Sequence, residues 1–144
     1  MRPIQLLVLG MLVVLVSHTQ ILARDRSITI PSDFLDAIMM VESGGDPNAV
    51  GDGGKAIGAF QIHRGYWKDA VAFDKTLGGT YNDCFDPAYA RRVVVAYMRR
   101  YAPAGATMED MARLHNGGCN ILKRKGSKAW DATTAYWNKV RKHL

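Results

Sequence analysis

The chain has 144 residues and a formal net charge of +6. This length is enough for one domain that folds around its own hydrophobic core. It holds only two cysteines, with no CxxC pair, and four scattered histidines, which argues against a metal site, so we expect no metal and no cofactor.

The first 23 residues form a pattern of their own. Arg2 supplies a positive charge, an almost wholly apolar run follows over 6–16, and Ala23 precedes the charged residues 24–26. This layout is typical of a secretory signal peptide that is cleaved after Ala23. The alternative is a membrane anchor, which needs a longer apolar run of roughly 20 residues. We therefore expect residues 1–23 to be removed and residues 24–144 to be secreted as one soluble domain without a transmembrane segment.

The secreted chain would be basic. Removal of residues 1–23 takes away Arg2 and no acid, so 19 − 1 = 18 basic side chains against 13 acidic ones leave a charge of +5. Such a surface attracts anionic partners, whether nucleic acid, anionic lipid or an acidic cell wall, and its charge alone does not choose among them. No recognisable nucleic-acid-reading motif accompanies the basic residues, so we expect no specific nucleic-acid partner. We expect a monomer.

The first predicted helix opens at residues 31–33, which offer capping side chains, and ends at the glycine pair 44–45. Helical steps back from Glu42 reach Ile38 and Leu35, so the carboxyl group lies on the stripe that faces the core. Apolar surroundings raise the pKa of a carboxylic acid, and such a group can deliver a proton near neutral pH. Glu42 is therefore a candidate general acid, the alternative being a partly exposed glutamate at a helix end.

A long segment over 46–83, rich in glycine and aromatic residues, follows this helix. Only residues 55–62 look like a strand, so we expect at most a small hairpin, and we expect a binding cleft in this irregular part. Asp52 lies among glycines that leave room for its carboxylate over a cleft, and it is either a second catalytic carboxylate or a plain turn aspartate. Asp46, before a proline, is interpreted as a turn residue.

Three further helices are predicted downstream. One opens with Asp86 as a cap and proline at the first helical position and runs to about residue 101. Another begins at a sequence that resembles a capping box, 107–110, and ends at 116–118. The last begins near Thr133 or Thr134. The expected fold class is therefore mainly α, in the α+β sense: a small helical domain with a short hairpin and a cleft.

The two cysteines lie downstream of the predicted signal peptide. In an oxidising compartment an even pair is more often bridged than free, so we expect a disulfide between Cys84 and Cys119. Closing a loop of 119 − 84 + 1 = 36 residues would stabilise the fold by about 3–4 kcal/mol in the chain-entropy model.

Four sequence pieces occur in order along the chain: 42–44 (ESG), 58–67 (GAFQIHRGYW), 112–118 (ARLHNGG) and 135–140 (AYWNKV). Together they resemble the invertebrate-type lysozymes, also called the destabilase family, over nearly all of residues 32–142. The first two pieces also resemble the wider lysozyme-like superfamily, which includes goose-type lysozymes and lytic transglycosylases. The chain differs from the family pattern in having few cysteines.

The resemblance implies a small, mainly helical lysozyme fold that cleaves the β-1,4 bond between N-acetylmuramic acid and N-acetylglucosamine in peptidoglycan. It places the general acid of the family on Glu42 and the second acid nearest Asp52. Some members are also credited with isopeptidase activity through a serine and a histidine. His115 could match that histidine, but no serine can be placed, so we do not carry this activity over.

Four more residues are expected to line the cleft. Gln61 either hydrogen-bonds a sugar acetamido group or stabilises a turn, and Tyr66 either stacks on a sugar face or packs in the core. His115 and Asn116 end a helix beside two glycines, where they either cap it or contact substrate, and the resemblance favours contact.

The sequence is thus interpreted as a secreted lysozyme that acts on bacterial peptidoglycan, for defence or digestion, with the anionic cell wall as its partner. Two alternatives stay open. One is lytic transglycosylase chemistry with a single glutamate. The other is a non-catalytic, wall-binding protein that keeps the fold.

Overall fold

The computed structural model describes residues 28–144, so the predicted signal peptide lies outside the described residues and stays a prediction. The elements follow one another as α1 (Ser32–Ser43), β1 (Val50–Gly51), η1 (Asp52–Gly54), β2 (Ala56–Ile57), β3 (Ile62–His63), α2 (Arg64–Phe73), η2 (Tyr81–Phe85), α3 (Pro87–Tyr101), α4 (Met108–Gly117), η3 (Ile121–Lys123) and α5 (Lys128–Val140), where η marks a 3₁₀ turn. The expected mainly helical fold is confirmed. Over residues 28–144, no helix has the length and apolar character that crossing a membrane requires.

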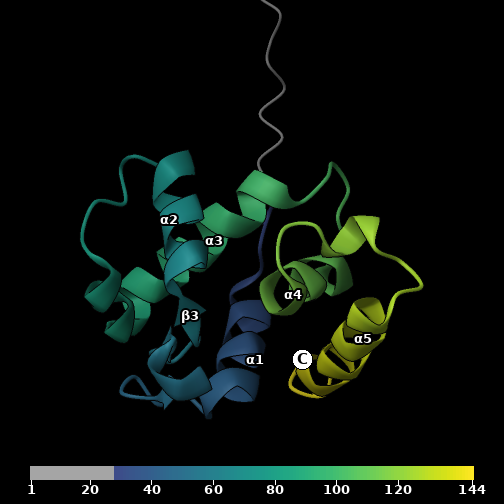
Figure 1. Ribbon diagram of the computed structural model, residues 1–144, viewed down its shortest axis with the longest axis horizontal. Coiled ribbons are helices and arrows are strands. Elements are labelled where there is room, and N and C mark those ends of the chain that lie inside the picture. Colours follow the sequence, from purple (N-terminus) through teal and green to yellow (C-terminus); the bar gives the residue numbers. More distant parts are fainter. Residues whose placement is uncertain (1–27) are drawn as a thin grey trace, which may run out of the picture.

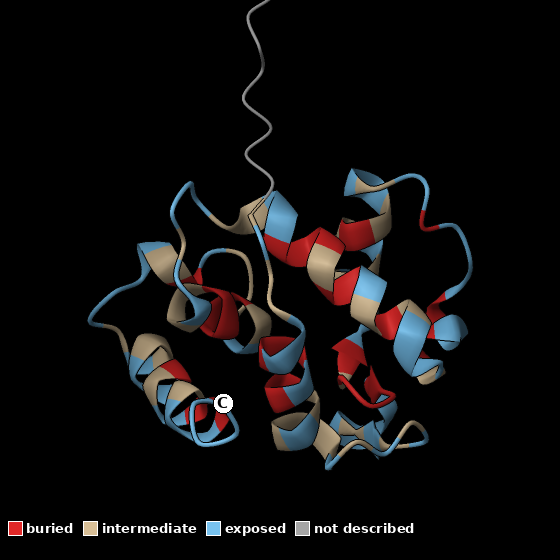
Figure 2. Ribbon diagram, turned by 180° about the vertical axis from the view of Figure 1, so that it is seen from behind, coloured by how far each residue is buried: buried red, intermediate tan, exposed pale blue. Residues whose placement is uncertain are grey.

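The helices form two pairs with α1 between them (Figure 1). α2 packs against α3 on one side of the molecule, and α4 packs against α5 on the other. α1 contacts α5, and the small sheet lies against the start of α2. Seen from behind, α1 and α3 carry buried stripes alongside exposed ones, as amphipathic helices around a shared core do (Figure 2).

The sheet is larger than the predicted hairpin by one strand. Its three antiparallel strands follow the order β1-β2-β3, with Val50 opposite Ile57 and Ala56 opposite His63. Two residues per strand give few ladder hydrogen bonds, so the sheet needs support from outside. Tyr81 in η2 supplies it, because its hydroxyl lies 2.7 Å from the carbonyl oxygen of Ile62.

The helix starts follow the capping signals in two of the predicted helices. The Asp86 side chain accepts a hydrogen bond of 2.8 Å from the Ala88 amide, and proline occupies the first position of α3. At α4, Thr107 and Asp110 form the predicted capping box, each side chain accepting from the backbone amide of the other. The start of α1 differs, since Pro31 is its N-cap and makes no side-chain capping bond.

Two helix boundaries depart from the prediction. α2 lies inside the segment that we expected to be irregular, and α5 begins at Lys128 rather than near Thr133. α2 lacks a side-chain cap at its start, so it has no local signal of the kind that marks α3 and α4. The N-cap of α5 is Ser127, whose hydroxyl accepts from the Trp130 amide at 3.2 Å.

Buried apolar side chains from all five helices and from the sheet region form the core. Each large apolar side chain in it stabilises the fold by about 1.5–3 kcal/mol relative to exposure. On α3, the side chains at positions 90, 93, 94 and 97 are buried and Tyr101 is half-buried, while three of its four arginines are exposed. Fully buried large side chains include Phe34 and Ile38 of α1, Phe60 and Ile62 of the sheet region, Met98 of α3, and Met111 and Leu114 of α4.

The expected disulfide is not formed in the structure, where Cys84 and Cys119 are both free thiols. The two residues lie in different surroundings: Cys84 is buried in η2, and Cys119 follows α4 and packs near Tyr97. Burial, together with the nearby Asp83 carboxylate, raises the pKa of the Cys84 thiol to about 12. Since the thiolate is the reactive form, Cys84 behaves as a small apolar core residue.

Candidate active site

A polar cleft of about 270 Å³ opens where the end of α1, the sheet, the start of α2 and the end of α4 meet. It brings together all six residues that the sequence singled out for catalysis or substrate binding. The lining consists of those six, Glu42, Asp52, Gln61, Tyr66, His115 and Asn116, together with Ala56 and His63.

Glu42 is held in the last turn of α1, with 17% of its side chain exposed. The helix ends directly after it, because Gly44 adopts a left-handed conformation with φ of 67°. The next side chain, Ser43, donates a hydrogen bond of 2.8 Å to the carbonyl oxygen of Ala59 and so ties the helix end to the loop between β2 and β3. The Glu42 carboxylate therefore lies at the junction of helix and sheet.

Two donors meet at one oxygen of this carboxylate. The Tyr136 hydroxyl of α5 lies 2.7 Å from Oε1 of Glu42, and Nε2 of His115 in α4 lies 3.3 Å from the same atom. Within residues 28–144, no hydrogen bond is recorded to Oε2. This second oxygen is thus the one on which a transferable proton can reside without displacing either donor.

Tyr66 fixes the orientation of His115. Its hydroxyl lies 3.1 Å from Nδ1 of His115, and its ring stacks on Tyr97 with centroids 3.6 Å apart. Burial raises the pKa of Tyr66 well above its usual value, and the neighbouring Tyr97 and Glu42 add to this shift, so the hydroxyl keeps its proton. In the neutral tautomer with the proton on Nε2, His115 donates to Glu42 and accepts from the Tyr66 hydroxyl at Nδ1. As an imidazolium, it can also donate from Nε2 to Glu42. Because Tyr97 covers one ring face, Tyr66 serves as a support in this structure.

The pKa of Glu42 shifts in the direction opposite to our expectation. Burial is the largest influence and raises the pKa, and the charge of Asp52 adds a smaller upward shift. Hydrogen bonds from His115 and Tyr136 and the electrostatic interaction with His115 outweigh both effects, so the pKa lies below the usual value for glutamate. The expectation was correct about the effect of burial and wrong about the net shift of the pKa. The spacing within the first helix could not indicate the two donors, because they come from α4 and α5.

Asp52 enters the cleft from the glycine-rich loop as predicted. It begins η1 and has a φ of 49°, a left-handed conformation that is uncommon outside glycine. Its Oδ2 lies 2.8 Å from Nε2 of His63, and 67% of its side chain is exposed. The contact with His63 fixes the direction of the carboxylate, while its exposure leaves it free to meet a ligand.

Gln61 lines the cleft from the turn between β2 and β3. It also has a positive φ, of 49°, and its Nε2 donates to the Gly58 carbonyl oxygen at 3.1 Å, so it does stabilise a turn. A Cβ atom on Gly51 would lie 2.1 Å from Oε1 of Gln61. Only glycine therefore fits at position 51 while the amide oxygen keeps this place in the cleft.

A family model described as Destabilase matches residues 31–143. This chain belongs to the destabilase family. Its structure is also similar to a chain in the crystal structure of Aeromonas hydrophila PliI in complex with Meretrix lusoria lysozyme, with 32% sequence identity and a TM-score of 0.62. That similarity covers 78% of this chain and 89% of the other. No match was found among the curated proteins.

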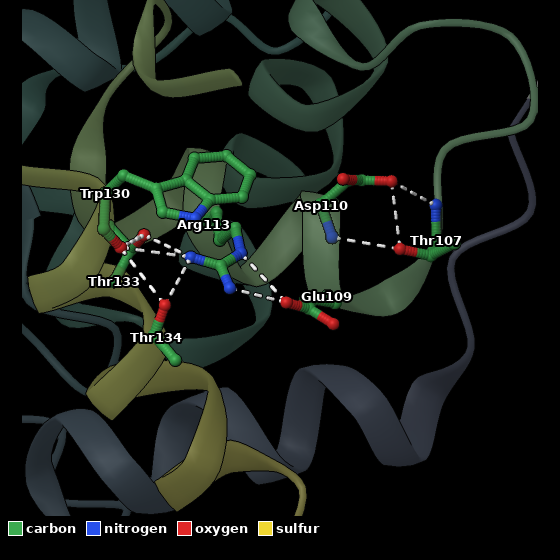
Figure 3. Close-up of polar contacts among 7 residues, drawn as sticks. All are labelled: Thr107, Glu109, Asp110, Arg113, Trp130, Thr133 and Thr134. Atoms are coloured by element: carbon green, nitrogen blue, oxygen red, sulfur yellow. Dashed lines mark hydrogen bonds and ion pairs between the residues drawn. The ribbon is translucent and has the colours of Figure 1, made fainter. Parts of the chain in front are cut away.

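This destabilase-family chain also has a buried arginine that joins the two helices supplying the Glu42 donors (Figure 3). Arg113 of α4 is 3% exposed and donates to Glu109 at 2.5 and 3.0 Å. It also donates to the Thr133 and Thr134 hydroxyls of α5 at 2.8 and 3.0 Å, and its guanidinium lies 3.9 Å from the Trp130 ring centroid. In the sequence, Arg113 is marked only as one residue of the 112–118 motif.

Two other residues of the destabilase-family site were not predicted. Tyr136 falls within the predicted last helix, but no local pattern pairs it with a glutamate 94 residues earlier. His63 stands in a quoted motif, yet its contact with Asp52 arises only when the sheet forms. Over residues 28–144, no three or more His, Cys, Asp or Glu side chains form a group that could hold a metal ion.

Proposed function

We propose that this chain is a secreted lysozyme that hydrolyses the β-1,4 bond between N-acetylmuramic acid and N-acetylglucosamine in bacterial peptidoglycan. The observation that carries the proposal is the position of Glu42 and Asp52 in one polar cleft, with both donors to Glu42 on a single oxygen. The family match and the likeness to a chain of a lysozyme complex support it.

Glu42 would act as the general acid. Glycosidic cleavage needs a proton on the leaving oxygen, and Oε2 is the carboxyl oxygen that can carry it toward the sugar. His115 and Tyr136 hold Oε1 and thereby stabilise the carboxylate that remains after proton transfer. Since the pKa of Glu42 is lowered, the protonated acid is depleted as pH rises, and we expect greater activity on the acid side of neutrality.

Asp52 would supply the second carboxylate. An oxocarbenium-like centre forms at the anomeric carbon as the bond breaks, and a carboxylate stabilises it, attacks it or activates the incoming water. The hydrogen bond from His63 orients Asp52 for this task. The amides of Gln61 and Asn116 line the same cleft and provide hydrogen-bonding partners for the acetamido groups of the sugars.

A serine-type isopeptidase mechanism finds no support in this cleft. Such a mechanism needs a hydroxyl or thiol nucleophile within hydrogen-bond reach of a base. Within the described part of the chain, the cleft lining contains no serine, threonine or cysteine. Ser43, next to Glu42, uses its hydroxyl to hold the Ala59 carbonyl. The proposed activity is therefore on the glycan.

The test compares wall lysis by the wild type, Glu42→Gln and Asp52→Asn, each checked for folding by its melting temperature. Loss of a general acid lowers the rate by roughly 10²–10⁴-fold. Asp46→Asn is the matched control, because Asp46 is exposed and only accepts from the Asn48 amide in a turn. Equal rates for the wild type and Glu42→Gln would reject the proposal. Products with 1,6-anhydro ends, and full activity in Asp52→Asn, would assign the protein to lytic transglycosylase chemistry instead.

A further inference from the structure

A second and larger groove, of about 730 Å³, lies away from the catalytic cleft. It is formed by the start of α1, the end of α2 with the residues that follow, and the outer side of α3, which crosses the face seen in Figure 2. The two sites share no lining residue. Leu35 in the groove and Glu42 in the cleft are separated by about 10 Å along the axis of α1. We call it the α1–α3 groove.

The floor of the α1–α3 groove is apolar. Leu35, Leu77 and Ala96 form buried parts of it, and Phe73 stands beside them with half of its surface exposed. The Phe73 ring extends the apolar surface of the depression, so that a ligand with an apolar part would cover both.

The rim of the groove is basic. Lys75, Arg91, Arg92 and Arg99 line it together with one acid, Asp74. Arg91 is paired with Asp36 outside the lining, so three cations face one carboxylate. Hydrogen bonds from Thr76, with the charges of Arg92 and Arg99 adding to them, lower the pKa of Asp74, so it is ionised and the rim keeps a net charge of 3 − 1 = +2.

We propose that the α1–α3 groove binds a free, single-chain anionic amphiphile, an alkyl chain with a phosphate or carboxylate head. The chain would lie on the apolar floor, and the head would meet Arg92, Arg99 and Lys75 at the rim. The volume falls in the usual range of small-ligand pockets, roughly 300–1,000 Å³. The lining is smaller than one side of a standard protein–protein interface, about 20–30 residues, which favours a small ligand over a protein partner.

The test is calorimetric titration of the whole secreted chain with dodecyl phosphate below its micelle concentration. Dodecyl maltoside carries the same alkyl chain with a neutral head, and inorganic phosphate carries the head alone. The groove predicts saturable one-to-one binding of dodecyl phosphate, with affinity at least roughly tenfold weaker for either partial ligand.

Two variants link the binding to the rim. Arg92→Gln with Arg99→Gln removes two rim cations, and the proposal expects a loss of affinity of roughly tenfold or more. Arg99→Gln alone, which removes no hydrogen bond recorded in residues 28–144, guards against a folding defect and should show a smaller loss. The charge-matched control is Arg124→Gln with Arg141→Gln, two exposed positions outside the groove. Wall lysis should be equal in the rim double variant and in its charge-matched control.

Several results would overturn the proposal. Equal affinity for dodecyl phosphate and dodecyl maltoside would show that the rim charge plays no part. Equal loss in the rim variant and in the control would indicate attraction by net charge only. Binding to phosphatidylglycerol vesicles without binding to monomeric dodecyl phosphate would assign the surface to a membrane. Each of these outcomes is independent of whether the protein hydrolyses peptidoglycan.

Discussion

The buried Arg113 guanidinium joins α4 to α5, and these helices carry the two groups that hold Glu42. Replacement by methionine removes the charge and the donors while it keeps an unbranched side chain of similar reach. Each group that loses Arg113 must then find water or another partner, and the structure shows which of them can. The free energy of unfolding of Arg113→Met is therefore a direct measure of what the guanidinium contributes.

The loss can be worked out group by group. Glu109 has 42% of its side chain exposed, so its carboxylate regains water and no buried charge is left unpaired. The Thr133 hydroxyl keeps its own bond of 2.7 Å to the Trp130 carbonyl oxygen. What remains is the loss of charge-assisted hydrogen bonds, about 1.5–3 kcal/mol, and of the cation–π contact with Trp130, about 1 kcal/mol. We expect destabilisation of about 2.5–4 kcal/mol, or a Tm lower by roughly 10–16 °C for a domain of this size.

Urea denaturation and thermal melting followed by circular dichroism measure this loss. Arg124→Met is the matched control, because Arg124 is exposed after η3, and we expect it to lie within about 0.5 kcal/mol of the wild type. A fall of Tm in Arg113→Met no larger than in the control would refute the reasoning, since the guanidinium contacts would then contribute nothing net. A loss well above about 5 kcal/mol would show that Glu109 stays dehydrated.

Two other predictions concern the acid and the sheet. Tyr136→Phe removes a donor that lowers the pKa of Glu42, so the acid should stay protonated to higher pH and the base-side limb of kcat/KM should move upward; an unmoved limb in a folded variant contradicts this. Gly58→Ala places a Cβ 2.1 Å from the Cys84 carbonyl oxygen at a φ of +74°, so we expect a loss of at least about 1–3 kcal/mol in denaturation. Gly65→Ala, in open space at the start of α2, should instead stabilise by about 0.5–1 kcal/mol, and a similar loss in both would disprove the steric explanation.

Local signals decided which helices could be predicted. α3 and α4 begin with capping side chains that bond to their own first turns, so a few adjacent residues specify the boundary. α2 has neither a cap nor a long apolar pattern, and it packs against α3, with Tyr66 stacked on Tyr97 and Trp67 hydrogen-bonded to Tyr89. Its position was set by tertiary contacts, for which the sequence offers no short-range sign. The third strand was missed for the same reason, since two residues carry no periodicity.

The sequence predicted which residues line the candidate site better than it predicted the contacts between them. The helical spacing placed Glu42 on the core-facing side of its helix, and the glycines around Asp52 left room for that carboxylate over a cleft. The resemblance then gave both residues a catalytic role and favoured substrate contact for His115 and Asn116, which line the same cleft. These residues belong to short motifs that remain intact in the sequence. The contacts that adjust their chemistry join separate motifs, and no motif specifies them.

The pKa of Glu42 shows what that difference means for mechanism. Helical periodicity correctly indicated a carboxyl group with apolar neighbours, and burial does raise its pKa. Two donors from other helices then reverse the direction, because a hydrogen bond to the charged form stabilises that form. A glycan bound as proposed would cover the cleft and remove water from Oε2, and this desolvation would raise the pKa of Glu42 again. We therefore expect the pKa of Glu42 to rise as the sugar binds, so that Glu42 is protonated before the bond breaks. After the proton has been transferred, the two donors at Oε1 stabilise the carboxylate that remains.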